Sequence, residues 1–267
     1  MINTQDSLQE NRQDPLQKNM PNAQNSSVST EEIAHFSALA QNWWDPNGPM
    51  RLLHAMNPAR IAWAIRHMPL QEISPHQKTT RQARILDIGC GAGIASESFA
   101  KAGYDVLGLD ASAEGIAAAQ AHLAHTPLPA DANHLQYRCG KPEDLVHEKQ
   151  NFDAVIAFEL IEHVTDPKQF MILLAQLIKP GGTLIISTLN RTLSSLIIGK
   201  IVAEYLFHLV PTGTHTWRKF IQPSELGRYA RQAGLHMTAI TGFSALSGCW
   251  KESHHLSINY AAAFKKL

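Results

Sequence analysis

The sequence contains few cysteines and no excess of charge of either sign. Three cysteines occur among 267 residues, and they lie far apart, at Cys90, Cys139 and Cys249. Their spacing fits neither a metal site nor a disulfide framework, so we expect a reducing compartment, the cytoplasm. Acidic and basic residues number 23 each, and no long basic run supports a nucleic-acid partner.

The N-terminal end lacks the features of a targeting segment. Residues 1–29 are rich in Asn, Gln and Ser, without the apolar stretch of a signal peptide or the Arg-rich face of a transit peptide. Such a segment buries too little apolar surface to offset its ordering entropy, so we predict a disordered tail. Residues 30–82 are predicted to form helices and a linker that contribute to the functional site, with one helix starting at Asn57–Pro58 and ending near His67.

Residues 83–267 have the pattern of one α/β domain. Near-continuous apolar strands alternate with helices, which predicts a parallel sheet covered by helices on both faces. A turn is predicted at residues 179–182, before the fifth strand. The predicted strands are 83–89, 105–110, 135–139, 152–158, 183–188, 235–243 and 257–264, and the predicted helices are 94–102, 113–125 and 167–177.

A glycine loop follows the first predicted strand. Gly89, Gly91 and Gly93 let the backbone turn tightly and approach a ligand closely. Asp110 ends the next strand, about 20 residues later, where a carboxylate accepts the hydroxyls of a ribose. Glycines that merely serve a tight turn would not need this acid, so the combination predicts a nucleoside-binding site.

The residues around the loop distinguish two kinds of cofactor. A dinucleotide fingerprint reads G-x-G-x-x-G, whereas here the third glycine comes one residue early and Ile94 stands in its place. Asp87, just before the loop, would repel a pyrophosphate but attract a sulfonium and an ammonium group. The pattern therefore favours S-adenosylmethionine over a nicotinamide cofactor.

With these features the chain resembles the class I S-adenosylmethionine-dependent methyltransferases over residues 85–264. The resemblance implies a Rossmann-like α/β fold with a seven-stranded, mostly parallel sheet, strand order 3-2-1-4-5-7-6, and the last strand antiparallel. It also implies that the glycine loop faces the methionine part of the donor and that Asp110 holds its ribose.

Two acids and a histidine follow the fourth predicted strand, at the edge where ligands of open α/β sheets bind. On a helix, Glu159, Glu162 and His163 would share one face, because their spacing is i, i+3, i+4. They suit a divalent cation such as Mg²⁺, or general-base work on a phenol-like hydroxyl. In the other interpretation the acids lie at a helix terminus and His163 contacts the substrate, because similar stretches occur in metal-free methyltransferases.

Motifs outside the common core resemble the ubiquinone biosynthesis O-methyltransferases over about residues 32–264. The matching segments are residues 36–45, 53–60, 187–191, 203–205, 210–215, 219–226, 240–242 and 259–260. This resemblance implies that a polyprenylated catechol or hydroquinone is methylated at two steps of ubiquinone synthesis.

The same resemblance implies roles for individual residues. Catalytic and metal-binding roles, with Mg²⁺ as the ion, fall on Glu159, Glu162 and His163. Two positions depart from the family, since Ala92 stands where members often have Gly and Phe158 where at least one relative has Met. Donor-binding roles fall on Arg60, Gly89, Asp110 and Phe158, beside Asp87, Gly91 and Gly93.

An apolar stretch with one polar stripe follows the fifth predicted strand. Residues 189–222 are predicted to be an inserted segment that faces the substrate or a membrane, and Lys200, Glu204 and His208 recur in it at four-residue spacing. The stretch is too short and too charged to span a bilayer. It is interpreted either as a buried helix over the substrate pocket or as an interfacial helix on the inner face of the membrane, where it admits a polyprenyl substrate.

Two other functions stay open at this point. The enzyme could act on a soluble phenolic substrate, or the chain could be a non-catalytic donor-binding scaffold for other ubiquinone-biosynthesis enzymes. The acids and the histidine after the fourth strand speak against a scaffold. The remaining histidines, among them His122, show no ligand spacing and are expected at the surface.

Overall fold

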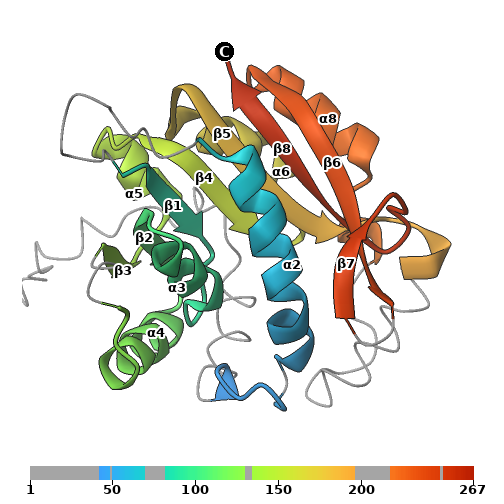
Figure 1. Cartoon of the computed structure of the whole chain (residues 1–267). Helices are drawn as coiled ribbons and strands as arrows, with labels where there is room; N and C mark the ends of the chain where they lie inside the picture. The colour runs from blue at the N-terminus through green and yellow to red at the C-terminus, as the bar shows by residue number, and fades with distance from the viewer. Residues whose placement is uncertain (1–41, 49, 70–81, 130–133, 196–216, 247–248) are drawn as a thin grey trace, which may run out of the picture.

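Eight strands form one mixed sheet with helices on both of its faces (Figure 1). The computed structural model describes residues 42–48, 50–69, 82–129, 134–195, 217–246 and 249–267. The predicted N-terminal tail and most of the predicted inserted segment lie outside these residues. The strands are β1 (Arg84–Ile88), β2 (Asp105–Asp110), β3 (Leu135–Cys139), β4 (Phe152–Phe158), β5 (Ile178–Leu189), β6 (Leu235–Leu246), β7 (Cys249–Ser253) and β8 (Asn259–Lys266).

The strand order is β3-β2-β1-β4-β5-β8-β6-β7. The strands from β3 to β5 are parallel, and β8 runs antiparallel to both of its neighbours. The predicted order is therefore confirmed, with β8 as the antiparallel strand that the prediction placed last. The structure adds β7, an edge strand antiparallel to β6, which was not predicted because its short, mostly polar sequence carries no apolar run.

The helices of the described residues are α2 (Arg51–His67), α3 (Ile94–Lys101), α4 (Ala113–His125), α5 (Pro142–His147), α6 (Pro167–Gln176) and α8 (Pro223–Gln232). Two expectations were wrong. The helix predicted to start at Asn57 begins at Arg51, so Pro58 lies inside α2. Proline favours a first turn, but here the burial of Met56 and Asn57 outweighs the lost hydrogen bond.

The second error concerns the turn predicted at residues 179–182. These residues belong to β5, which shows a register irregularity against β4 and a positive φ of 73° at Gly181. A bulge accommodates such a glycine without ending the strand.

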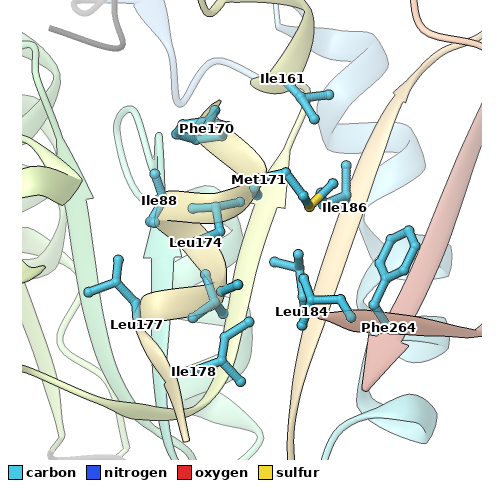
Figure 2. Close-up of a cluster of buried hydrophobic side chains, with 14 of the residues drawn as sticks. Ile88, Ile161, Phe170, Met171, Leu174, Leu177, Ile178, Leu184, Ile186 and Phe264 are labelled. Atoms are coloured by element: carbon cyan, nitrogen blue, oxygen red, sulfur yellow. The ribbon is translucent and has the colours of Figure 1, made fainter. Parts of the chain in front are cut away.

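Both faces of the sheet are buried, so the central strands are apolar at nearly every position. Leu184 and Ile186 of β5 point toward α6 and α8, and Figure 2 shows them with Met171 and Leu174 of α6. Ile185 points to the other face and belongs to a cluster formed with α2 and α3. Packing on both faces of the sheet therefore holds the carboxyl ends of β1, β2, β4 and β5 in place.

Candidate active site

The loop between β1 and α3 has the conformation that only glycine adopts easily. Gly89, Gly91 and Gly93 have φ angles of 70°, 53° and 89°, a region where other residues are strained. The loop is tied to the end of β2, because the Gly89 N–H donates to the Leu109 carbonyl at 2.8 Å. Ala92 has no positive φ, so an alanine is accommodated at this position of the loop without backbone strain.

Side chains from distant parts of the chain pack directly against these glycines. A Cβ atom on Gly91 would lie 2.5 Å from Cζ2 of Trp43, and one on Gly89 would lie 2.9 Å from Leu160. A Cβ on Gly93 would collide with the Tyr137 hydroxyl. The glycines are therefore required by packing as well as by the turn.

Asp110 lies at the end of β2, as predicted, and its carboxylate faces the loop. Its Oδ2 accepts a hydrogen bond from the Gly91 N–H at 2.8 Å, and its Oδ1 accepts one from the Ser112 N–H at 2.8 Å. Burial raises the pKa of Asp110, and these backbone donors oppose the rise. These donors hold the acid in one orientation at the carboxyl end of β2.

Asp87 of β1 lies below the loop and is 2% exposed. Its Oδ2 accepts a hydrogen bond from the Ser96 hydroxyl of α3 at 2.6 Å. Burial raises the pKa of Asp87 to about 6, while the Ser96 hydrogen bond and the charge of Arg60 lower it. A positively charged ligand nearby would favour the ionised form of this acid.

Arg60 of α2 contacts two residues at the carboxyl end of β4. It is 4% exposed, and its guanidinium carbon lies 4.4 Å from the centre of the Phe158 ring. Its Nη1 lies 3.4 Å from Oε1 of Glu159. Among the described residues the buried Nε–H of Arg60 has no partner, so the site holds a donor that a ligand can use.

The segment that holds the acids after β4 is not an α-helix, so the shared helical face considered for Glu159, Glu162 and His163 does not form. Glu159 has a φ of 49°, and the following residues form one short 3₁₀ turn, η4 (Ile161–His163). The left-handed conformation at Glu159 turns the chain sharply after β4 and lets its backbone N–H reach the carbonyl of Ser187 at 2.9 Å. Apolar spacing carries no signal for such a single-residue reversal.

Two consecutive residues of β5 each bond to one of the two acids. The Ser187 hydroxyl donates to Oε1 of Glu159 at 2.7 Å, and the Thr188 hydroxyl donates to Oε2 of Glu162 at 2.8 Å. Successive side chains of a strand point to opposite faces, so the two carboxylates bond to groups on opposite faces of β5. These two hydroxyls lie in a segment that carried the family resemblance, but no role was predicted for them.

Glu162 is 5% exposed. Burial and, after it, the negative charge of Glu159 raise its pKa to about 7, while His163 opposes the rise. His163 follows directly in η4 and is half-buried. The three residues predicted as catalytic are thus near one another at the carboxyl end of β4.

The same three residues do not form a metal site in this arrangement. In the part of the chain that the structure describes, no group of three His, Cys, Asp or Glu side chains is placed to hold a metal ion. Oε1 of Glu159 is already bonded to Ser187 and lies near Arg60, and Glu162 is bonded to Thr188. The predicted Mg²⁺ ligands therefore do not fit the ion as they stand.

None of the helices within the described ranges has the length and apolar character that crossing a bilayer requires.

Comparisons with known proteins agree with this geometry. The family described as a methyltransferase domain matches residues 64–240. Among solved structures, an S-adenosylmethionine-dependent methyltransferase from Thermotoga maritima superposes with a TM-score of 0.60 at 16% identity, covering 88% of this chain and 99% of that one. Magnesium protoporphyrin IX methyltransferase from Synechocystis PCC 6803, with bound S-adenosylhomocysteine, gives a TM-score of 0.60 at 19% identity, covering 88% and 95%. These structures establish the fold.

Two curated relatives are much more similar in sequence. The chain is 40% identical to the ubiquinone biosynthesis O-methyltransferase of Rhodopseudomonas palustris (strain HaA2), over 92% of this chain and 96% of that protein. It is 39% identical to the protein of the same name from Coxiella burnetii (strain CbuK_Q154), over 91% of this chain and 98% of that protein. The chain therefore belongs to the ubiquinone biosynthesis O-methyltransferase family, a group of S-adenosylmethionine-dependent enzymes.

Proposed function

We propose that this protein transfers a methyl group from S-adenosylmethionine to a ring hydroxyl of a polyprenylated catechol or hydroquinone intermediate, at two steps of ubiquinone synthesis. The observation that carries the proposal is the 2.8 Å hydrogen bond from the Gly91 N–H to Asp110, which joins the glycine loop and the acid of β2 into one unit. About 40% identity to enzymes of that name supports the acceptor class.

The residues around this unit fit the donor. The Asp110 carboxylate, an acceptor, suits the ribose hydroxyls, and the unpaired Nε–H of Arg60 suits an anionic group such as the donor's carboxylate. Asp87 supplies negative charge below the loop, and Phe158 offers an apolar face. When bound, S-adenosylmethionine supplies an electrophilic methyl group on a positively charged sulfur. Arg60 and Asn57 come from α2, which supports a role of residues 30–82 in the site.

At the reacting end, the chain must remove a proton from the acceptor hydroxyl. We assign this work to Glu162 and His163, at the carboxyl end of β4, and assign to Glu159 the positioning of Arg60. A phenol has a pKa near 10, so roughly one in a thousand is ionised at pH 7 and a nearby base is needed. The buried surroundings exclude water and favour the reaction of an anionic oxygen with a sulfonium.

Two substitutions separate donor binding from catalysis. Asp110→Ala should abolish binding of S-adenosylhomocysteine in a calorimetric titration, because both ribose contacts are lost. Glu162→Gln should keep the hydrogen bond from Thr188, bind the same ligand normally and lower methyl transfer to a short-chain prenylated catechol by at least tenfold. Normal binding by Asp110→Ala would show that the donor lies elsewhere, and normal turnover by Glu162→Gln would remove that residue from catalysis.

Magnesium stays a prediction that follows from the family resemblance. Carboxylates and an imidazole are ligands that such a site uses, but Glu159 and Glu162 would first have to leave Ser187 and Thr188. No catalytic step is therefore derived from the ion.

We also propose that the protein meets its substrate at a membrane surface through residues 189–222. Both described ends of this segment lie together, because the Trp217 indole N–H donates to the Thr192 carbonyl at 2.8 Å. Next to them Leu193 is 73% exposed, which suits an apolar partner. A liposome flotation assay tests the proposal: deletion of residues 193–210 should abolish lipid association, whereas flotation of the deleted protein, or failure of the full chain to float, would favour a soluble phenolic substrate.

A further inference from the structure

The segment before α2 places two tryptophans against the donor loop. Trp43 is 9% exposed, and the six-membered part of its indole lies directly on Gly91. Trp44, the next residue, donates its indole N–H to the Ala92 carbonyl at 2.9 Å. We call Trp43 and Trp44 the tryptophan pair. Both contact the loop that the proposed donor site uses, yet nothing in that function requires a tryptophan.

The tryptophan pair is fixed to two helices. The Nε2–H of His54, on α2, donates to the Trp43 carbonyl at 2.8 Å, because a carbonyl can only accept. The Trp44 ring stacks on His122 of α4, with the ring centres 3.4 Å apart and the planes 4° apart. The position of Trp44 is thus set by its N–H on one side and by its face on the other.

The ring of His122 is fixed in turn. Its Nδ1 bonds to Oε1 of Glu97 at 2.6 Å, and Glu97, which is 1% exposed, also accepts from Lys101 at 3.3 Å. A buried carboxylate with two cationic or polar donors resists displacement. His122 was expected at the surface, but it is half-buried and serves as a platform for Trp44.

We propose that the tryptophan pair positions the glycine loop for donor binding, with Trp43 as the outer wall over Gly91 and Trp44 as the anchor that holds it there. This inference rests on the proposed donor site. Fixing the loop before the donor arrives lowers the entropy lost on binding. Without the Trp44 N–H, the Ala92 carbonyl loses a partner and the loop gains freedom. The pair therefore acts on donor affinity and not on the acceptor or on proton transfer.

Two conservative variants separate this role from simple packing. Trp44→Phe keeps a ring to stack on His122 and removes the N–H. Trp43→Phe keeps an aromatic side chain but removes the part of the indole that contacts Gly91. Trp250→Phe is the matched control, because Trp250 lies on the edge strand β7, away from the loop. Thermal unfolding and far-ultraviolet circular dichroism identify any variant that fails to fold.

The full chain is titrated with S-adenosylhomocysteine, followed by calorimetry and by intrinsic tryptophan fluorescence. We expect binding about fivefold weaker in Trp44→Phe, the loss of about one net hydrogen bond, and about tenfold weaker in Trp43→Phe. The ligand should change the fluorescence of the wild type and of Trp250→Phe, and this change should disappear in Trp43→Phe. In turnover, the KM for the donor should rise, while kcat and the KM for the acceptor stay within about twofold of the wild type.

Wild-type affinity and an unchanged fluorescence response in both loop variants would overturn the inference. Asp110→Ala, titrated in parallel, separates this result from a failure of the proposed function. If Asp110→Ala does not bind while Trp43→Phe and Trp44→Phe bind normally, only the role of the tryptophan pair is wrong. If Asp110→Ala binds normally, the donor site itself is misplaced.

Discussion

The Tyr137 hydroxyl of β3 donates to the carbonyl of Gly93 at 3.4 Å, and its ring fills the space that a side chain on Gly93 would need. Gly108 of β2 leaves room for the same ring. The end of the glycine loop is therefore supported from below by a tyrosine that belongs to neither of the predicted donor-binding segments.

This contact predicts the effect of substitution at Gly93. Gly93→Ala should destabilise the protein by about 3 kcal/mol, because it adds a clash with Tyr137 to the strain of a positive φ. Gly181→Ala is a matched control, since Gly181 has a φ of 73° and nothing within 4 Å of its added Cβ. It should lose only about 1 kcal/mol. Urea unfolding measures both values, and equal losses would contradict the role of Tyr137.

The buried acid Asp87 predicts a pH dependence of stability. Its pKa of about 6 in the folded protein is above its value of 3.8 outside the fold, so the folded state binds the proton more tightly. The stabilising contribution of this group is complete below about pH 4 and is lost as the pH rises through 6, about 3 kcal/mol in all.

Asp87→Asn keeps an acceptor for Ser96 but does not titrate. Without ligand, the wild type should lose stability relative to Asp87→Asn between pH 4 and pH 7.5. Denaturant unfolding across this range measures the difference. A constant difference would mean that Asp87 has an ordinary pKa in the folded protein.

The contact between Arg60 and Glu159, 3.4 Å between Nη1 and Oε1, predicts a coupling between the two residues. Arg60→Met should destabilise the protein by about 3 kcal/mol, because it leaves a carboxylate at the end of β4 without its cation. Adding Glu159→Gln should recover about 1 kcal/mol. A double-mutant cycle by urea unfolding gives the coupling, and strictly additive losses would show that the pair does not interact.

Removal of divalent ions tests the magnesium prediction. The magnesium prediction requires Glu159 and Glu162 to leave Ser187 and Thr188, and on that condition dialysis against EDTA should lower methyl transfer at least tenfold and Mg²⁺ should restore it. Donor binding by calorimetry should not change, because the predicted ligands lie after β4 and not on the glycine loop. Activity within about twofold of the untreated enzyme would mean that the arrangement seen here, with the acids bonded to Ser187 and Thr188, is the catalytic one.

Elements whose signals are local could be predicted from the amino-acid sequence. The strands β2, β3 and β4 and the helix α4 have the predicted bounds, because strand and helix periods and the glycines and prolines around them are short-range features. The proximity of the glycine loop to an acid at the end of the next strand could also be predicted from the sequence, because parallel strands bring their carboxyl ends to one edge of the sheet.

Contacts between residues far apart in the chain became visible in the folded structure and could not be predicted beforehand. The fold placed Pro58 inside α2, gave Glu159 a left-handed backbone, and bonded the two acids to two consecutive residues of β5. It also put Trp43 against Gly91, although the two residues lie far apart in the sequence. Packing between elements outweighs local preference at these positions. The spacing of residues along the chain does not predict which surfaces pack against each other.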